Sequence, residues 1–488
     1  PLGNYRPAVG DEVIFLTTGE GLTAFSPALL DVSALDPALD YAVATRSGSL
    51  LFTVTTAPTP ELEEELLQVA ASPSQRSVGQ TLADACRRAT GALLADCRAL
   101  AQAGLDPNLP QALEAISPEE VVAPADTAQG GATGQTRRVG ARLKALRSGA
   151  TPISLDRVTF HLEDGRVLGA ADLNRLLGSG GAAGDGQDSP ETLEASFGPW
   201  GVFVDGNIGL GDKDPTASET GYEFEVYSLT LGADYRLNRE TILGAALDYA
   251  RTDTELDQDG GQVDSDSLTL NLYGSYYPGE RWFVDGLVGY GRLDFDQQRR
   301  IRYALATGTQ VNQSADADYD GDQWIVSLGT GYNLERGALS FGPEGRLQYT
   351  RTELDAFRER IGNPDAPGGG LAVAMEEQDV ESLTLNLGGQ ASYALSQSWG
   401  VLVPQARLEW VHEFRDDSRG ITGRFAEDPA GERFTIRTDD PDRNYFNLGL
   451  GASAVFPGGL NAYAYYEAVL GYEDLDHQSL GVGVRWEF

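Results

Sequence analysis

The sequence is poor in cysteine, methionine and basic residues for its length. Its 488 residues include 2 Cys, 1 Met and 36 Lys and Arg against 73 Asp and Glu, which gives a net charge of −37. Two cysteines exclude a disulfide-dense scaffold, and the acidic excess excludes a nucleic-acid binder that relies on a basic surface. No run reaches the roughly 18 to 20 apolar residues of a membrane-spanning helix, which excludes a helical membrane protein. Because the chain starts at Pro1 without a signal peptide, we expect a mature form or a fragment.

Motifs of catalysis are also lacking. The three histidines, His161, His412 and His477, are dispersed along the sequence, and no metal or triad spacing links them. There is no Gly-x-Ser-x-Gly elbow, Cys-x-x-Cys pair or phosphate-binding loop. We therefore predict a non-enzymatic protein without catalytic residues, cofactor or bound metal.

Two acidic segments match the first half of a calcium-binding loop, in which carboxylates alternate before a glycine. They are Asp316-x-Asp318-x-Asp320-Gly321 and Glu255-x-Asp257-x-Asp259-Gly260. Their twelfth positions hold Ser327 and Asp266 rather than the expected Glu. Solvated loop tips are the better interpretation, and calcium binding stays open as the alternative.

What the sequence does contain is a repeated alternation of apolar with small polar residues. Residues 228–231, 267–272 and 382–387 are the clearest examples, and this period of two predicts β-strands. An aliphatic face opposite a face of Ser, Thr, Asn, Gln and Gly suits a strand between lipid and a lumen. Twelve such segments can be marked, at 200–210, 222–237, 241–252, 265–277, 281–294, 322–334, 338–352, 378–395, 398–414, 444–456, 459–472 and 476–488.

The connections between these segments alternate in length. Very short turns at 238–239, 278–280, 335–337, 396–397 and 457–458 separate long polar loops at 211–221, 253–264, 295–321, 353–377 and 415–443. Short turns opposite long loops are typical of an outer-membrane β-barrel, whereas a soluble sandwich has no need of them.

Aromatic residues support the same interpretation. Trp282 and Trp399 fall near short turns, where amphipathic rings would lie at a membrane interface. The last strand alternates apolar residues with Gly, Arg and Glu and ends on an aromatic, which resembles the C-terminal signal read by the barrel-assembly machinery. The candidate signal residues are Leu480, Val482, Val484, Trp486 and Phe488.

Charged residues within the strands are expected to face the lumen, because a charge facing lipid costs about 2–4 kcal/mol near the bilayer midplane. Their mixed signs predict cross-strand pairs in a hydrated interior. The predicted lumen-facing set is Asp205, Asp234, Arg236, Asp248, Asp285, Glu344, Arg346, Arg407, Glu409, Glu467 and Arg485.

The first 194 residues divide into three predicted segments. Residues 1–55 read as the last rungs of a stacked β-structure, with a small autonomous β-domain as the alternative. Residues 61–149 form a helical linker region in which Cys86 and Cys97 are disulfide candidates. On one straight helix these cysteines would lie about 16 Å apart, too far to bond, but Gly91 could turn the segment into a hairpin; buried thiols are the alternative. Residues 150–194 are rich in Gly, Ala and Asp and predict a flexible linker.

One stretch reverses the overall charge. No acidic residue lies between Asp126 and Asp156, yet five basic residues fall within eleven positions: Arg137, Arg138, Arg142, Lys144 and Arg147. A basic helix at 133–149 that plugs an acidic lumen would explain this reversal, and a solvated linker helix is the alternative.

Residues 195–488 resemble the translocator of a monomeric bacterial autotransporter, of the type V secretion class. The resemblance is carried by Trp200-Gly201-Val202-Phe203, Gly232-Ala233-Asp234-Tyr235-Arg236-Leu237, Gly331-Tyr332-Asn333, Trp410-Val411-His412-Glu413-Phe414 and Phe488. Upstream, residues 5–54 are similar to the C-terminal stem of a β-helical passenger, and residues 112–120 to the helical junction after it. The resemblance implies a twelve-stranded barrel that holds the segment before its first strand in the pore, usually nearer to that strand than 133–149.

We therefore predict an all-β membrane protein, a twelve-stranded antiparallel up-and-down outer-membrane β-barrel at 195–488, preceded by a small β-stem and a helical linker region. It would export and anchor its own N-terminal passenger, whose body is absent here, and place the N-terminal region at the cell surface. The expected partners are the barrel-assembly machinery, outer-membrane lipid with lipopolysaccharide, and the passenger, with no nucleic acid and a monomeric state. The alternatives are a channel or porin with a periplasmic N-terminal domain, and a surface adhesin acting through its acidic loops.

Overall fold

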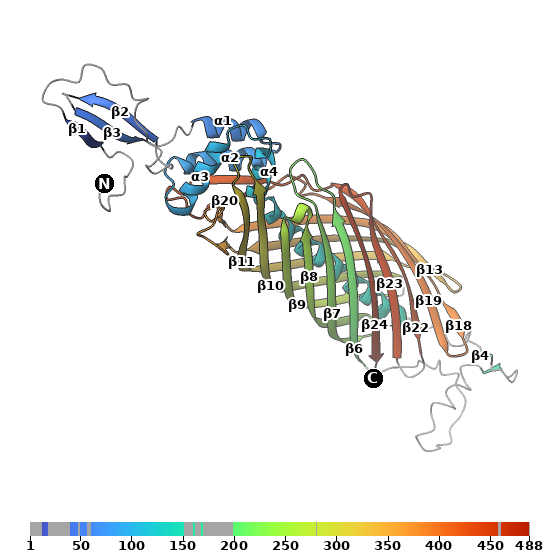
Figure 1. Ribbon diagram of the computed structural model, residues 1–488. Helices are drawn as coiled ribbons and strands as arrows, with labels where there is room; N and C mark the ends of the chain where they lie inside the picture. Colours follow the sequence, from blue (N-terminus) through green and yellow to red (C-terminus); the bar gives the residue numbers. More distant parts are fainter. Residues whose placement is uncertain are drawn as a thin grey trace.

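The computed structural model describes residues 12–17, 40–46, 49–55, 60–150, 160–161, 167–168, 199–279, 281–456 and 460–487. Within these residues the chain forms a closed β-barrel, a bundle of short helices at one mouth of the barrel and a long helix inside it (Figure 1). The predicted twelve-stranded antiparallel barrel is confirmed.

Each barrel strand pairs antiparallel with its neighbours in the chain, and pairing of the last strand with the first closes the cylinder. Two short strands, β12 (Leu334–Arg336) and β18 (Leu395–Gln397), extend the sheet beside the turns. The twelve barrel strands are β6 (Trp200–Lys213), β7 (Tyr222–Asn238), β8 (Thr241–Leu256), β9 (Gly261–Tyr276), β10 (Trp282–Ala304), β11 (Gln310–Tyr332), β13 (Leu339–Leu354), β17 (Gln378–Tyr393), β19 (Gly400–Glu413), β22 (Asn444–Val455), β23 (Leu460–Leu470) and β24 (Leu475–Glu487).

The alternation in sequence becomes two faces of the barrel wall. On β9, Leu268, Leu270 and Leu272 point outward and are 51%, 51% and 58% exposed, while Thr269 and Asn271 point inward and are buried. Because successive side chains of a strand point to opposite faces, this register gives the middle of β9 an apolar outer side and a polar inner side. The outer side is the surface that lipid would cover.

Aromatic side chains mark the end of the barrel with short turns, here named the short-turn end. Trp282, Trp399 and Trp486 all point outward there and are at least 42% exposed. The signal residues Leu480, Val482 and Val484 also face outward on β24, while Phe488 lies outside the described residues. Both the start of β6 and the end of β24 therefore lie at the short-turn end.

The opposite end, named the long-loop end, differs from the expectation. Strands β10 and β11 continue through the predicted loop 295–321 and meet in a turn near residues 305–309. Most of the predicted loop 253–264 is strand as well, apart from the short turn η4 (Asp257–Asp259). The extensions persist because their inward residues, such as Phe295 and Ile301, are buried against helices.

This extension also corrects the description of the first acidic segment as a loop tip. Asp316, Asp318 and Asp320 lie on the extended strand β11, opposite β10, rather than on a loop that could wrap around an ion. Among the described residues, no group of three or more His, Cys, Asp or Glu is arranged to hold a metal.

The loops predicted at 353–377 and 415–443 contain further strands. Four of them form a small antiparallel sheet at the long-loop end, in the order β14 (Phe357–Arg358), β16 (Val373–Met375), β20 (Gly420–Phe425) and β21 (Arg433–Arg437). A fifth, β15 (Arg360–Ile361), pairs with β11. We refer to the four-stranded sheet as the outer sheet.

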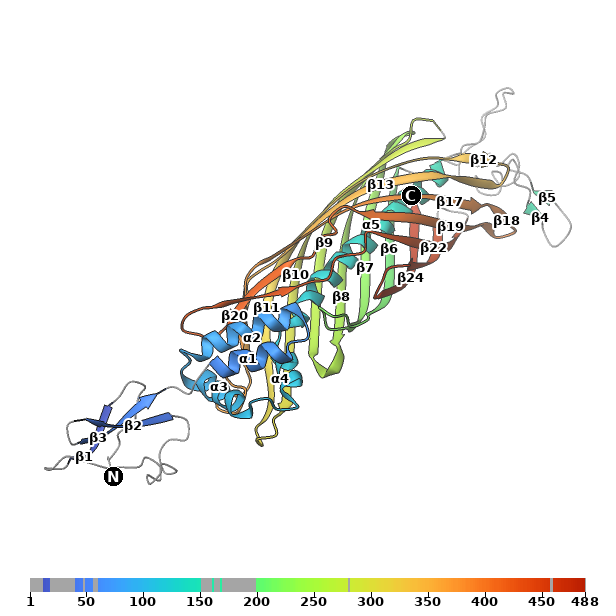
Figure 2. The same cartoon turned by 90° about the horizontal axis from the view of Figure 1, so that it is seen from above.

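The helical region begins with four short helices and a single 3-10 turn. They are α1 (Pro60–Val69), α2 (Pro73–Cys86), α3 (Gly91–Ala103), α4 (Leu109–Ile116) and η2 (Glu119–Val122). We refer to residues 60–122 as the helical cap. Figures 1 and 2 show it packed over the long-loop end of the barrel.

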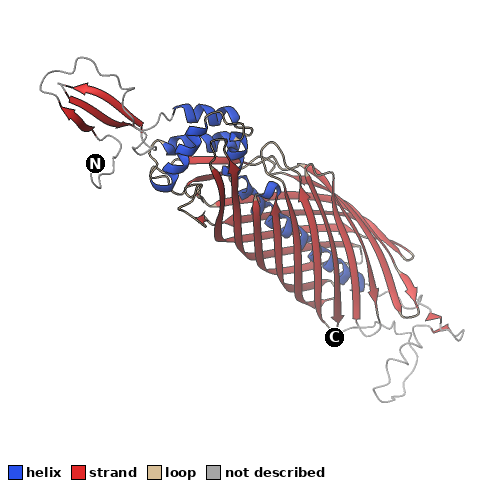
Figure 3. Ribbon diagram, viewed as in Figure 1, coloured by secondary structure: helices blue, strands red, loops and turns tan. Residues whose placement is uncertain are grey.

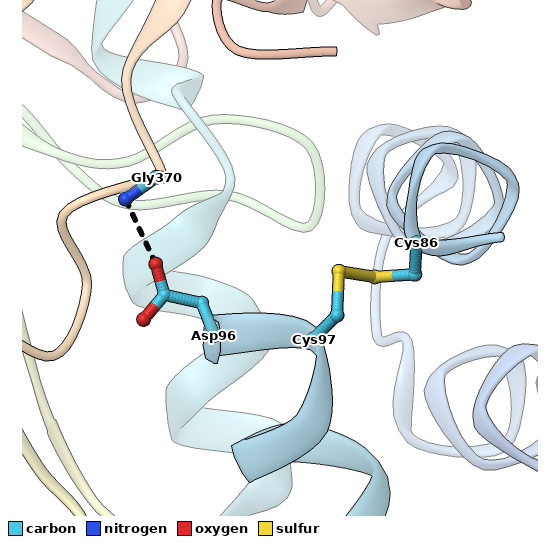
Figure 4. Close-up of a disulfide and its surroundings, with 4 residues drawn as sticks. All are labelled: Cys86, Asp96, Cys97 and Gly370. Atoms are coloured by element: carbon cyan, nitrogen blue, oxygen red, sulfur yellow. Dashed lines mark hydrogen bonds between the residues drawn. A yellow bond between two sulfur atoms is a disulfide. The ribbon is translucent and has the colours of Figure 1, made fainter. Parts of the chain in front are cut away.

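A disulfide joins the second and third helices of the cap. Helix α2 ends at Cys86 and α3 begins at Gly91, whose φ of 61° lets the chain reverse. Cys86 and Cys97 then lie 5.5 Å apart between Cα atoms and are bonded (Figure 4). No free cysteine occurs in the part of the chain that the structure describes.

The N-terminal segment forms three strands, β1 (Glu12–Thr17), β2 (Asp40–Arg46) and β3 (Ser49–Thr55). They pair antiparallel in the order β1-β3-β2. The assignment of residues 1–55 to the C-terminal stem of a β-helical passenger stays a prediction, with a small autonomous β-domain as its alternative. Of the predicted flexible linker 150–194, only Ala150, β4 (Phe160–His161) and β5 (Val167–Leu168) lie within the described residues.

Candidate functional site: the lumen and its helix

A single long helix, α5 (Ala123–Ala150), runs through the barrel from the long-loop end to the short-turn end (Figures 2 and 3). Its 28 residues span about 42 Å at about 1.5 Å per residue, more than the roughly 30 Å hydrocarbon core of a bilayer. Pro124 lies in its first turn, where a missing N–H costs nothing. Among the described helices, none is both long and apolar enough to span a bilayer itself.

One face of α5 is apolar and packs on the barrel wall. Val139, Leu143 and Leu146, spaced four and three residues apart, are buried together with inward side chains that include Ile242 and Ile325. This spacing puts the three residues on one stripe of the helix. The stripe fixes the rotation of α5, so its basic residues face the acidic parts of the wall.

The basic residues form ion pairs with carboxylates from different strands. Arg138 Nη2 lies 3.3 Å from Asp248 Oδ2 on β8, and Arg142 pairs with Asp234 on β7. These four side chains are at most 13% exposed.

Further pairs extend the contact along the helix. Arg147 Nη1 lies 2.6 Å from Asp285 Oδ2 on β10, and Arg137 Nε lies 3.5 Å from Glu467 Oε2 on β23. Together the pairs hold α5 from opposite sides of the lumen. Charges buried in this way attract more strongly than exposed ones, and removing one partner leaves the other uncompensated.

Aromatic rings reinforce two of these arginines near the short-turn end. The guanidinium of Arg142 lies 4.4 Å from the ring centre of Phe203, and that of Arg147 lies 3.7 Å from the ring centre of Phe283. A cation over an aromatic face adds roughly 0.5–2 kcal/mol, more when water is excluded.

A close backbone approach fits α5 to the wall at Gly140. A Cβ at this position would lie 2.7 Å from the guanidinium nitrogen Nη2 of Arg346 on β13. The absence of a side chain therefore leaves room for a basic group of the wall to lie against the basic helix.

The wall carries its own network of opposite charges. Arg407 Nη2 lies 2.7 Å from Glu467 Oε1 and Arg407 Nε lies 3.6 Å from Glu409 Oε2. Arg485 lies 3.4 Å from Asp234, and Asp205 accepts a hydrogen bond from the Tyr465 hydroxyl. Asp234 and Glu467 each contact both α5 and another wall residue, so helix and wall share one network.

All of the predicted lumen residues lie at buried or half-buried positions of the barrel strands. Asp205, Asp234, Asp248, Glu409, Glu467 and Arg485 are buried, whereas Arg236, Asp285, Glu344, Arg346 and Arg407 are half-buried. Among the predicted plug residues, Lys144 is also half-buried on α5, where the carboxylate of Glu344 attracts its ammonium group. Arg236 donates to the Tyr277 hydroxyl at the short-turn end.

A second buried charge cluster lies at the long-loop end and was missed in the sequence. Arg299 on β10 is 1% exposed, and its Nη2 lies 2.6 Å from Glu359 Oε2 while its Nε lies 3.0 Å from Glu120 Oε1. The three residues come from a predicted loop, a second predicted loop and the end of the cap. Since no local pattern links segments so far apart, only the fold could reveal the cluster.

Burial changes the acidity of two glutamates beside this cluster. It raises the pKa of Glu120 to about 8, against the opposing attraction of Arg299, and raises the pKa of Glu119 to about 7. The hydroxyl of Ser72 donates to Glu119 and partly offsets the effect. Near neutral pH these carboxyls therefore retain protons that an exposed glutamate would lose.

Comparison with known proteins places these features in one family. A family model described as the autotransporter β-domain matches residues 202–467. Esterase EstA of Pseudomonas aeruginosa is 28% identical over 304 residues, which is 60% of this chain and 43% of that protein. An extracellular serine protease of Serratia marcescens is 22% identical over 361 residues, which is 71% of this chain and 31% of that protein. The chain thus spans less than half the length of these relatives.

Solved structures show similar barrels. The translocator domain of the autotransporter NalP from Neisseria meningitidis is 20% identical, with a TM-score of 0.47, covering 61% of this chain and 91% of that chain. The β-domain of the Bordetella autotransporter BrkA is also 20% identical, with a TM-score of 0.42, covering 59% of this chain and all of that chain (100%).

Proposed function

The chain belongs to the autotransporter β-domain family of outer-membrane translocators, and from this premise we propose that its barrel carries its own N-terminal region to the cell surface and anchors it there. One observation supports this proposal above the others. Helix α5 crosses the lumen and joins the cap at the long-loop end to a barrel whose first strand starts at the short-turn end.

The topology gives this observation a direction. Short turns of outer-membrane barrels face the periplasm and long loops face outward. The start of β6 and the end of β24 both lie at the short-turn end, so the chain enters the barrel wall from the periplasm. Residues 60–122 lie at the other mouth, and their connection to the wall passes through the lumen as α5. In this orientation everything upstream of α5 lies outside.

We propose that α5 remains in the lumen after export because its ion pairs make withdrawal unfavourable. Arg138, Arg142 and Arg147 each contact a wall carboxylate, and moving the helix along the pore would break all three contacts together. Each broken buried pair leaves an uncompensated charge, at a cost of about 3–5 kcal/mol. The plug role thus follows from charge and burial rather than from a covalent link.

The proposed steps need no catalytic residue, because threading and closure break no covalent bond. Two relatives are named as an esterase and a serine protease, and the matches cover 43% and 31% of them. Those names describe the longer proteins. The region shared with the family model, 202–467, is barrel wall and its connections, and we assign no enzymatic reaction to it.

The same proposal includes the partners that assembly requires. Leu480, Val482 and Trp486 face outward on β24, where the barrel-assembly machinery could pair with the terminal strand before closure. Outer-membrane lipid and lipopolysaccharide would then cover the apolar outer face, and the closed wall leaves no free barrel edge to demand a second subunit.

A channel is the main rival, and the filled lumen argues against it. Helix α5 contacts wall residues on β7, β8, β10 and β23, so solutes would have to pass a side-chain network that spans the pore. An adhesin that acts through its loops is compatible with the same barrel, but it gives α5 no role.

Export of a foreign cargo tests the proposal. Residues 1–59 would be replaced by a small, cysteine-free, epitope-tagged domain, and antibody binding to intact cells would be measured. We expect display of the cargo at a level close to that of the native N-terminal region. Cargo that is detected only after cell lysis, beside a correctly folded barrel, would refute export and favour the channel.

A further inference from the structure

The helical cap and the barrel share one hydrophobic core. Buried side chains of the cap, among them Leu82, Leu93, Leu113 and Ile116, form a single cluster with barrel side chains such as Phe295, Ile301, Tyr303, Phe357, Phe425 and Phe434. These six barrel side chains come from the extension of β10 and from the outer sheet. Without the cap, they would present a contiguous apolar patch to water, a feature that marks a binding surface.

A barrel arginine caps the last turn of a cap helix. Arg299 lies 3.4 Å from the carbonyl oxygens of Ala115 and Ile116, at the C-terminal end of α4. Carbonyls in this last turn have no partner within the helix and favour a positive charge. Arg299 also binds Glu359 of the barrel. The barrel itself therefore positions the Arg299 guanidinium for its contact with α4.

A carboxylate of the cap, in turn, accepts hydrogen bonds from a loop at the long-loop end of the barrel. The backbone N–H groups of Gly368 and Gly370 donate to Asp96 on α3, at 2.6 and 2.8 Å. Figure 4 shows the bond from Gly370. At Gly370 the two backbones nearly touch, because a Cβ there would lie 2.2 Å from the backbone nitrogen of Leu93. Asp96 is adjacent to Cys97, so the disulfide fixes the helix that carries it.

The cap also covers the free edge of the outer sheet. Along one face of α2, Ser74 accepts from Arg437 N–H at 2.9 Å, Ser77 accepts from Thr435 N–H at 2.8 Å, and Thr81 donates to the Arg433 carbonyl at 3.0 Å. These partners alternate along β21, the last strand of the sheet. An uncovered edge strand would leave these backbone groups available to other chains.

We propose that the long-loop end of the barrel is a receptor surface for residues 60–122 of the same chain, and that docking of the cap holds the exported segment outside by contacts additional to the ion pairs of α5. The inference rests on the proposed function. Only residues 117–122 separate α4 from α5, so the cap can dock only while α5 occupies the lumen. Return of the cap into the pore would require the shared core, Arg299 and Asp96 to release it together.

The test uses Gly370→Ala in the full chain, with Gly362→Ala as the matched control. A Cβ at Gly370 meets the backbone of α3, whereas a Cβ at Gly362 has only the Ser314 carbonyl oxygen within 4 Å, at 3.7 Å. Intact cells would be treated with proteinase K, and the mass of the resistant barrel fragment would be followed over time. Asp96→Asn, made on the cap side, provides a second variant if Gly370→Ala fails to assemble.

In the wild type and in Gly362→Ala we expect a resistant fragment that still includes residues 60–122. In Gly370→Ala we expect the cap to be lost at least tenfold faster, leaving a fragment that begins near residue 123, and in Asp96→Asn a smaller acceleration. Equal rates in all four proteins would overturn the docking proposal. Protection of the N-terminal region until lysis in the wild type would instead contradict export, so the two failures are distinguishable.

Discussion

Single residues in the lumen combine charge, burial and ring contacts at one point. Arg147 illustrates this, since it binds Asp285, donates to Ser275 and lies over the Phe283 ring. Each interaction alone is modest, but a buried arginine that loses its carboxylate has no water to replace it. The arginines of α5 should therefore be far more sensitive to substitution than arginines at the surface.

Reversing one buried charge should loosen the helix. In Arg147→Asp, two carboxylates would face each other, and we expect a loss of about 3–5 kcal/mol in the free energy that holds the helix, seen as a rise in single-channel conductance in a planar bilayer. The double variant Arg147→Asp with Asp285→Arg should recover part of the closure. Arg302→Glu is the control, because Arg302 is 51% exposed in its pair with Asp259 and such pairs contribute about 0–1 kcal/mol. Conductance that is unchanged in Arg147→Asp would contradict the plug role.

Glu120 should make the docking of the cap depend on pH. Burial raises its pKa to about 8, well above its ordinary value of 4.5. The positive charge of Arg299 lowers this pKa, whereas the negative charges of Glu359 and Glu119 raise it. Because the pKa of Glu120 is higher in the folded state than in the unfolded state, protonation of its carboxyl stabilises the folded cap. This stabilisation is complete below about pH 4.5 and is lost as the pH rises through 8. After correction for the intrinsic rise of amide exchange with pH, the protection of α4 should therefore fall between about pH 5 and pH 8 and level off above it.

Glu120→Gln removes this titration while keeping the size of the side chain. We expect a flatter pH dependence of α4 exchange, with the largest gain in protection near pH 9. Glu376→Gln, on the surface of the outer sheet, is the control, since Glu376 is 45% exposed in its pair with Arg433. An identical slope in wild type and Glu120→Gln would exclude Glu120 as the source.

Whole elements show which features local sequence can and cannot reveal. The alternation at 267–272 predicts β9 and its outward face, because the period of a strand is a local property. The stretch without acids around Arg137 to Arg147 points to α5 for a similar reason. By contrast, the extension of β10 and β11 through 295–321 was predicted as a loop, because their Asp and Gln residues look solvated and their inward partners lie on cap helices more than 150 positions away.

The register of β9 can be tested with a charge on its outer face. In Leu270→Arg the new cation would face lipid, and we expect the free energy of unfolding to fall by about 2–4 kcal/mol, measured by urea titration in detergent or lipid. Gln262→Arg is the matched control, because Gln262 lies on the same face of the same strand but above the apolar band. Equal effects of the two substitutions would show that Leu270 does not face lipid.

The disulfide links α2 to α3 across 11 positions. Replacing Cys86 and Cys97 by Ser should lower the stability of the cap by about 2–3 kcal/mol, because the unfolded chain regains freedom that the bond removes. Proteolysis of the cap should accelerate while the heat-dependent mobility of the barrel in gel electrophoresis stays unchanged. A barrel that fails to fold without the bond would show that the disulfide acts on assembly rather than on the cap.

The whole molecule closes its pore in two ways. Helix α5 fills the lumen through buried ion pairs, and the cap covers the long-loop mouth through a shared core. Both closures require the same arrangement of the chain, with the cap on one side of the membrane and the ends of the barrel sheet on the other. Export, closure of the lumen by α5 and docking of the cap therefore all depend on the direction in which the chain passes through the pore.

Protease shaving of cells that carry an epitope at residue 1 measures this direction. Intact cells and lysed cells would be treated in parallel, with the mobility of the folded barrel as a control for assembly. We predict that the epitope is lost from intact cells, which places the N-terminus outside and α5 across the membrane. An epitope that survives until lysis, beside a folded barrel, would contradict export and make a channel with a periplasmic N-terminal region the better description.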